Sequence, residues 1–143
     1  MTSAMNSRDA IQLIDASWND WLAAIGAVPE ERWSEAGVCG VWSIKDLLGH
    51  LAVWDRHALD DLKLFAAGEL IPDIDVDEVN NREAGLRAHR SIAEQRREME
   101  DSHAALLAYL PAAAGIDLSE IGGDTWDHYP DHTGQVTAWS EML

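Results

Sequence analysis

The feature that most constrains the fold is an apolar stripe between Ser43 and Gly68. Its apolar residues recur at steps of three and four, the spacing that keeps side chains on one face of an α-helix. Ser43 is a favoured N-cap, and Asp46 stands three residues later, at the second position of a capping box. We therefore predict a long amphipathic helix that buries one broad face. The residues of this face are Ile44, Leu47, Leu48, Leu51, Trp54, Ala58, Leu62 and Phe65.

Three further segments show helical spacing, and no segment shows the alternation of a β-strand. The longest of them has two apolar stripes that do not coincide, so we expect it to bend. The last begins shortly before Pro130, because proline is tolerated in the first turn of a helix. Four such helices predict an all-α fold, a single four-helix bundle. The expected ranges are about 8–25, 77–110 and 127–143 for these helices, 112–124 for a loop and 1–143 for the domain.

Composition and charge limit the kinds of partner that the chain can have. Of its 143 residues, 26 are Asp or Glu and 10 are Lys or Arg, which gives a formal net charge of −16. Such a surface repels nucleic acid and anionic membranes, so we predict neither as a partner. The single cysteine, Cys39, cannot form an internal disulfide, and no apolar run is long enough to cross a bilayer. We expect a soluble, cytoplasmic protein.

Two histidines near the C-terminus, His128 and His132, are four residues apart. On a helix this spacing places two imidazoles on the same face, where they can hold one metal ion. The pair lacks the adjacent Glu of the His-Glu-x-x-His motif, so spacing alone favours ordinary core or surface histidines. His50, at the edge of the long stripe, is our candidate third ligand, and His57 on the same face is its main rival. Three neutral imidazoles would leave coordination positions open for water or substrate.

Four side chains near these histidines are candidates for a second shell or a pocket. Asp46 shares the face of the candidate third ligand, and Asp131 is next to the C-terminal pair, where either could orient a ligand imidazole. We favour the simpler explanation, that Asp46 caps its helix and Asp131 is a surface acid. Asn80 either reaches the cavity as a hydrogen-bond donor or packs near the start of its helix. Trp54 either walls an apolar pocket or fills the core.

Together these motifs resemble the DinB-like metalloenzyme superfamily and, within it, the ClbS/DfsB-like branch. The likeness spans nearly the whole chain and rests on Trp42-Ser-Ile-Lys-Asp-Leu-Leu-Gly-His50, the Asp-x-x-Asn segment 77–80 and the closing His128-Tyr-Pro-Asp-His132. It implies an up-down-down-up bundle, often a homodimer, with one histidine of the second helix and two of the fourth on a nickel or zinc ion. Carried over to this sequence, the metal ligands are His50, His128 and His132.

The resemblance also implies two kinds of reaction on a small-molecule substrate. Some members use the metal to activate a low-molecular-weight thiol for transfer or isomerisation, and ClbS-like members hydrolyse a strained electrophilic ring. Both would use a nucleophile held by the ion. The resemblance therefore predicts a metal-dependent enzyme that acts on a small electrophile. The alternative is a helical bundle that binds a metal or ligand and acts by sequestration, without catalysis.

Overall fold

The computed structural model describes residues 5–113 and 117–143. These residues form α-helices and short 3-10 helices and no β-strand, which confirms the predicted all-α class. The loop expected over 112–124 lies partly outside the described residues, and its second half contains a 3-10 helix. The α-helices are α1 (Ser7–Gly26), α2 (Ile44–Ala66), α3 (Val76–Arg87), α4 (Ile92–Tyr109) and α5 (Tyr129–Glu141), and the 3-10 helices are η1 (Glu30–Arg32), η2 (Leu110–Ala112) and η3 (Leu118–Asp124).

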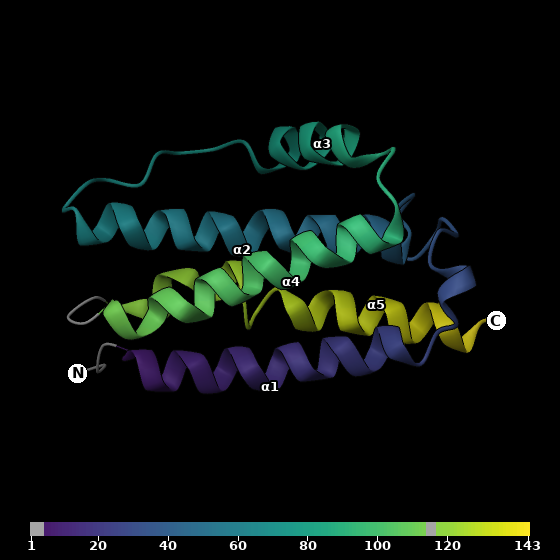
Figure 1. The fold of residues 1–143 in the computed structure, drawn as a ribbon, viewed down its shortest axis with the longest axis horizontal. Coiled ribbons are helices and arrows are strands. Elements are labelled where there is room, and N and C mark those ends of the chain that lie inside the picture. Colours follow the sequence, from purple (N-terminus) through teal and green to yellow (C-terminus); the bar gives the residue numbers. More distant parts are fainter. Residues whose placement is uncertain (1–4, 114–116) are drawn as a thin grey trace.

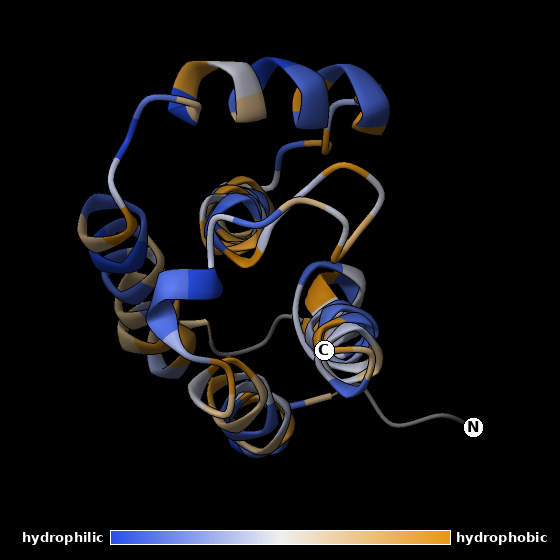
Figure 2. Ribbon diagram, turned by 90° about the vertical axis from the view of Figure 1, so that its right-hand side faces the viewer, coloured by the Kyte–Doolittle hydropathy of each residue, from blue (hydrophilic) through white to orange (hydrophobic). Residues whose placement is uncertain are grey.

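Four of the helices lie along the long axis of the molecule (Figure 1). The chain runs in one direction in α1 and α5 and in the opposite direction in α2 and α4. The main packing partners are α2 with α4 and α1 with α5. The short helix α3 lies outside this group and packs over α2, as the end-on view shows (Figure 2). The side of α2 that faces α3 is therefore not part of the central core.

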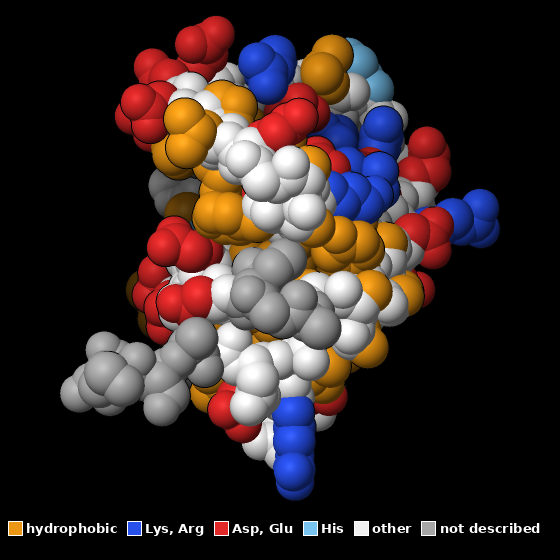
Figure 3. Space-filling view, turned by 90° about the vertical axis from the view of Figure 1, so that its left-hand side faces the viewer, with side chains coloured by type: hydrophobic (Ala, Val, Ile, Leu, Met, Phe, Trp, Pro, Cys, Tyr) orange, Lys and Arg blue, Asp and Glu red, His pale blue; other side chains and the backbone are white. Residues whose placement is uncertain are grey.

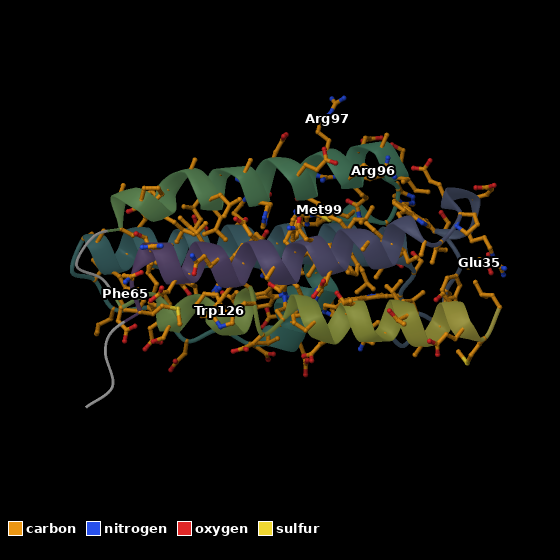
Figure 4. The ribbon with its side chains drawn as sticks, turned by 90° about the horizontal axis from the view of Figure 1, so that it is seen from below. Glu35, Phe65, Arg96, Arg97, Met99 and Trp126 are labelled. Carbon is orange, nitrogen blue, oxygen red and sulfur yellow. The ribbon has the colours of Figure 1, made fainter. Side chains whose placement is uncertain are left out.

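The core between the four long helices is built from the apolar stripes of the sequence. On α2, Leu47, Leu48 and Leu51 are fully buried. Met99 of α4 points into the bundle, where its sulfur accepts a hydrogen bond from Trp21 Nε1 at 3.5 Å, whereas Arg97 extends away from the ribbon (Figure 4). The apolar core is continuous along the bundle and includes residues of α1, α2, α4 and α5.

The bent helix that we expected over 77–110 is instead two helices. The hydroxyl of Ser91 accepts a hydrogen bond from the Glu94 backbone N–H at 3.1 Å, and the Glu94 carboxylate accepts from the Ser91 N–H at 3.3 Å. This capping box begins α4 as a new helix. The mismatch between the two apolar stripes therefore marks the boundary between two helices. α3 has no buried residue of its own.

The connection between α1 and α2 folds back over one end of the core. The indole of Trp33 donates to the Val28 carbonyl at 2.9 Å, and the Trp33 carbonyl accepts from the Lys45 N–H at 2.9 Å. Gly40 adopts a φ of 58°, which a residue without Cβ takes at no steric cost. The resulting turn places Trp42 half-buried beside His50, with their ring centroids 4.8 Å apart.

The surface is acidic in several places. Figure 3 shows separate groups of Asp and Glu side chains on the end of the molecule that carries the N-terminus, in keeping with the net charge of −16. Among the residues that the structure describes, no helix combines the length and the apolar character needed to cross a membrane.

Candidate metal centre

The structure brings the three histidines of the sequence prediction together between α2 and α5. His50 lies on α2, His128 occupies the N-cap position of α5, and His132 lies one turn later. Pro130 falls in the first turn of α5, where its missing N–H costs no helical hydrogen bond. The α5 helix therefore starts at the point in the chain that presents both C-terminal histidines to α2.

The three imidazoles converge on their Nε2 atoms. His128 Nε2 lies 2.9 Å from His50 Nε2 and 2.9 Å from His132 Nε2. One nitrogen from each ring lies within 4.8 Å of the other two. Donors that share one ion at about 2.0–2.1 Å lie about 2.8–3.4 Å apart, with the shorter distances in octahedral and the longer in tetrahedral geometry. The spacing of these nitrogens therefore suits a single divalent ion.

The other nitrogen of each C-terminal histidine shows which tautomer it adopts. His128 Nδ1 lies 3.3 Å from the backbone carbonyl of Asp124, and His132 Nδ1 lies 2.7 Å from Gln135 Oε1. Both oxygens only accept hydrogen bonds, so each Nδ1 carries the proton of its neutral imidazole. The two Nε2 atoms that face each other at 2.9 Å then both carry lone pairs. A cation between them would relieve the repulsion of these two lone pairs.

Burial keeps these imidazoles neutral. Burial, together with charge repulsion from His128 and His132, lowers the pKa of His50 to about 2. Burial likewise lowers the pKa of His128 to about 4 and lowers the pKa of His132. A neutral imidazole is the form that binds a metal ion, so the cluster is ready to act as a ligand set at pH 7.

The four candidates for a second shell or pocket take different places. Asp46 completes the predicted capping box of α2, since its carboxylate accepts from the Ser43 N–H at 2.9 Å. Trp54 is buried on the α3 side of α2 and donates from Nε1 to Asn80 Oδ1 at 2.8 Å. Asp131 is exposed, and the C-terminal pair is oriented instead by Gln135 and by the Asp124 carbonyl.

A cleft beside the cluster opens between α2 and α3. It is partly open to solvent, and the free space inside it is about 10 Å³, about enough for one water molecule. His50 contributes to both the histidine cluster and the wall of this cleft. Asp46 and Asn80 also line it, whereas Trp54 does not. Its lining includes apolar side chains and hydrogen-bonding groups, among them Trp42, Val53, Asn80 and Gln95.

His57, the rival third ligand, belongs to a second cluster two turns along α2. Its Nδ1 lies 2.9 Å from Asp124 Oδ2 and 3.5 Å from Asp61 Oδ2. The hydrogen bond to Asp124 raises the pKa of His57. Asp124 thus contacts both clusters, through its side chain at His57 and through its carbonyl at His128.

The sequence prediction missed a buried polar group formed by Asp55, Tyr129 and His103, beside the histidine cluster at the start of α5. Asp55 of α2 is fully buried and accepts hydrogen bonds from the Tyr129 hydroxyl and from His103 Nδ1, the latter at 2.9 Å. His103 of α4 is buried and stacks on Trp18 with ring centroids 3.7 Å apart. An acid four residues after Leu51, inside an apolar stripe, is the sequence signal that points to this group.

The fold and the site together define an all-α bundle with a three-histidine cluster suited to a metal ion. The sequence profile of the DinB superfamily matches residues 13–142, and the chain belongs to this superfamily. Comparisons with curated proteins and with solved structures returned no match.

Proposed function

We propose that the protein is a metal-dependent enzyme that acts on a small electrophilic molecule by thiol transfer or hydrolysis. The observation that carries this proposal is the 2.9 Å approach of His128 Nε2 and His132 Nε2, with the Nδ1 atom of each ring turned toward an oxygen acceptor. His50 Nε2, also 2.9 Å from His128 Nε2, supplies a third donor nitrogen, and the three ligand atoms lie within 4.8 Å of one another. Membership of the DinB superfamily supports a metal site in this position.

The donor set fits nickel or zinc. All three donors are imidazole nitrogens, which suit zinc, copper, iron and nickel and are less suited to the oxygen-seeking ions magnesium and calcium. Because no ligand is anionic, a bound divalent ion would keep its full charge and would lower the pKa of a water or thiol that binds it. Three protein ligands also leave room for such a molecule, as in catalytic rather than structural zinc sites.

The cleft between α2 and α3 supports the substrate part of the proposal. It borders His50, so a molecule bound there lies next to the proposed ion. Trp42 and Val53 provide apolar wall. Asn80 uses its amide oxygen to accept from Trp54, which leaves the amide nitrogen as a donor for a polar group. We infer that the side chains lining the cleft move apart to take a small, partly apolar substrate and, in the thiol reaction, a low-molecular-weight thiol.

The test is turnover of an electrophilic probe by protein loaded with nickel or zinc. We expect an epoxide or a halo-aromatic probe to be consumed, with or without a thiol, and we expect His50→Ala to lose this activity. The matched control is His89→Ala, since His89 is exposed and lies between α3 and α4. Stoichiometric probe binding without product would favour the sequestration alternative and overturn the enzyme proposal.

Two finer assignments remain predictions at this stage. Placement in the ClbS/DfsB-like branch requires hydrolysis of a strained ring, which the epoxide probe without thiol measures directly. A homodimer is expected from the resemblance alone, and sedimentation of the purified protein would establish its oligomeric state.

A further inference from the structure

The two helices that supply the histidines make little contact with each other. α5 packs mainly along α1, and its contact with α2 is sparse. A metal site nevertheless requires its ligands at distances defined to within about 0.2 Å. Apolar packing between α2 and α5 is therefore a poor candidate for fixing the position of His50 relative to His128 and His132.

A hydrogen bond joins these two helices one residue after His128. The Tyr129 hydroxyl donates to Asp55 Oδ1, and Asp55 Oδ2 lies 2.9 Å from His103 Nδ1. The three side chains come from α5, α2 and α4, so one carboxylate connects three helices. Tyr129 directly follows His128 and is the first residue of α5, and Asp55 is five residues, or about 7.5 Å along the helix, from His50.

The burial of this group indicates a role beyond packing. Asp55 and Tyr129 both have a relative exposure of 0%. An ionised carboxylate costs several kcal/mol to bury, and apolar side chains of similar size usually serve stability at least as well. The hydrogen bonds of Asp55 compensate this cost and restrict the geometry, because a hydroxyl and a carboxylate must meet at a defined distance and angle.

We infer that Asp55 and Tyr129 are positioning residues for the metal centre, which hold the first turn of α5 at the distance from α2 that the three imidazoles need. This inference rests on the proposed metal site. His103 orients the Asp55 carboxylate from α4, and its own ring is held flat against Trp18, with an interplanar angle of 7°. The hydrogen-bonded group of Asp55, Tyr129 and His103 thus positions the ligands without contacting the ion.

The test uses Tyr129→Phe, which removes the hydroxyl and keeps the ring. We expect its affinity for nickel or zinc to fall by about ten- to a hundredfold, the usual effect of losing a group that supports a metal ligand. Affinity is measured by competition with a chelator, at a temperature where circular dichroism shows a fully folded protein. The visible spectrum of the cobalt-substituted protein should also change, because the ligand geometry changes.

The matched control is Tyr109→Phe, at the other tyrosine of the chain, which lies half-buried on α4. It should keep wild-type affinity and the wild-type cobalt spectrum. A Tyr129→Phe protein with wild-type affinity and spectrum would overturn the inference, even if its stability were lower. If the wild type itself binds no ion, the proposed function fails and the inference fails with it.

A second variant keeps the test decisive if Tyr129→Phe does not fold. Asp55→Asn still accepts a hydrogen bond from Tyr129, but a neutral acceptor bonds more weakly than a carboxylate. We therefore expect a severalfold loss of affinity, smaller than the loss in Tyr129→Phe, with a cobalt spectrum close to that of the wild type. Unchanged affinity in Asp55→Asn, with Tyr129→Phe unfolded, would also overturn the inference.

Discussion

Two histidine clusters lie on the same helix, and they differ in what surrounds the imidazole. At His50 the neighbours are two further imidazoles, and burial lowers the pKa of all three rings. At His57 the neighbours are the carboxylates of Asp61 and Asp124, and the hydrogen bond to Asp124 raises the pKa of the ring. Seven residues along α2 therefore separate an environment that keeps the imidazoles neutral from one that favours a protonated imidazole.

The comparison shows why geometry alone does not define a metal site. Both clusters place three ligand atoms within 4.8 Å of one another. In the His57 cluster the hydrogen bond to Asp124 raises the pKa of the ring, which favours a proton on the imidazole beside the two carboxylates. In the His50 cluster the facing lone pairs have no such proton, because both Nδ1 atoms of His128 and His132 carry theirs toward oxygen acceptors.

Loss of a ligand should have the largest effect on this comparison. We expect purified wild-type protein to hold about one nickel or zinc ion per chain by elemental analysis, and His132→Ala to hold almost none. His57→Ala should hold as much as the wild type, because its ring faces carboxylates rather than the triad. The reverse pattern, with the ion lost in His57→Ala and kept in His132→Ala, would show that the ligands are in the wrong cluster.

The pH dependence of the metal-free protein should separate the clusters next. The rings of His50 and His128, with pKa values lowered to about 2 and about 4, should show no titration in NMR spectra between pH 8 and pH 5. His57, with its pKa raised, should titrate above 6.5. Titration of His128 near pH 6.5 would contradict the buried, neutral cluster.

The two clusters should also make the stability of the folded state depend on pH in opposite directions. A lowered histidine pKa stabilises the folded state above about pH 6.5, and this contribution is lost as the pH falls toward the folded-state pKa of His128. The raised pKa of His57 stabilises the folded state below about pH 6.5, and this contribution is lost as the pH rises through the folded-state value. Denaturant unfolding of wild type and His57→Gln across pH 5–9 measures the second effect separately.

A smaller effect is expected from the residue that orients His132. Gln135 Oε1 accepts from His132 Nδ1 at 2.7 Å and thereby directs the Nε2 lone pair toward the other imidazoles. We expect Gln135→Leu to weaken ion binding by about tenfold. Asp61→Asn, the equivalent change beside the His57 ring, should leave the affinity unchanged in the same chelator competition. Equal affinities for all three proteins would show that Gln135 does not orient the ligand.

The parts of this structure that could be predicted from sequence are those fixed by nearby residues. The start of α2 followed from Ser43 and Asp46, and the position of His50 followed from the period of the apolar stripe. The start of α4 was equally local, but the Ser91–Glu94 capping box was overlooked because the long segment contains no proline. Gln135, three residues after His132, was within reach of the same helix-spacing argument.

The parts that could not be predicted depend on how distant segments pack. Asp124 reaches His57 across 67 residues of sequence, and this contact depends on η3 packing against α2. Asp55 and Tyr129 are 74 residues apart, and neither spacing nor composition pairs a buried acid with a particular tyrosine. Asp55 is an acid within an apolar stripe, a signal that the sequence prediction did not use, and its partners are set by the tertiary fold.

The smallest effect is expected from Asp61, and its sign sharpens the comparison between the clusters. Burial raises the pKa of Asp61, so the folded state binds its proton more tightly than the unfolded state does, and stability is lost as the pH rises above about 4. Asp61→Asn should therefore be neutral or stabilising at pH 7, by less than about 1 kcal/mol in urea unfolding. Asp60→Asn, an exposed neighbour, is the control. If Asp61→Asn lowered the free energy of unfolding by more than about 2 kcal/mol, the His57 cluster would depend on both carboxylates. The proton of His57 would then be shared between Asp61 and Asp124 rather than held mainly toward Asp124.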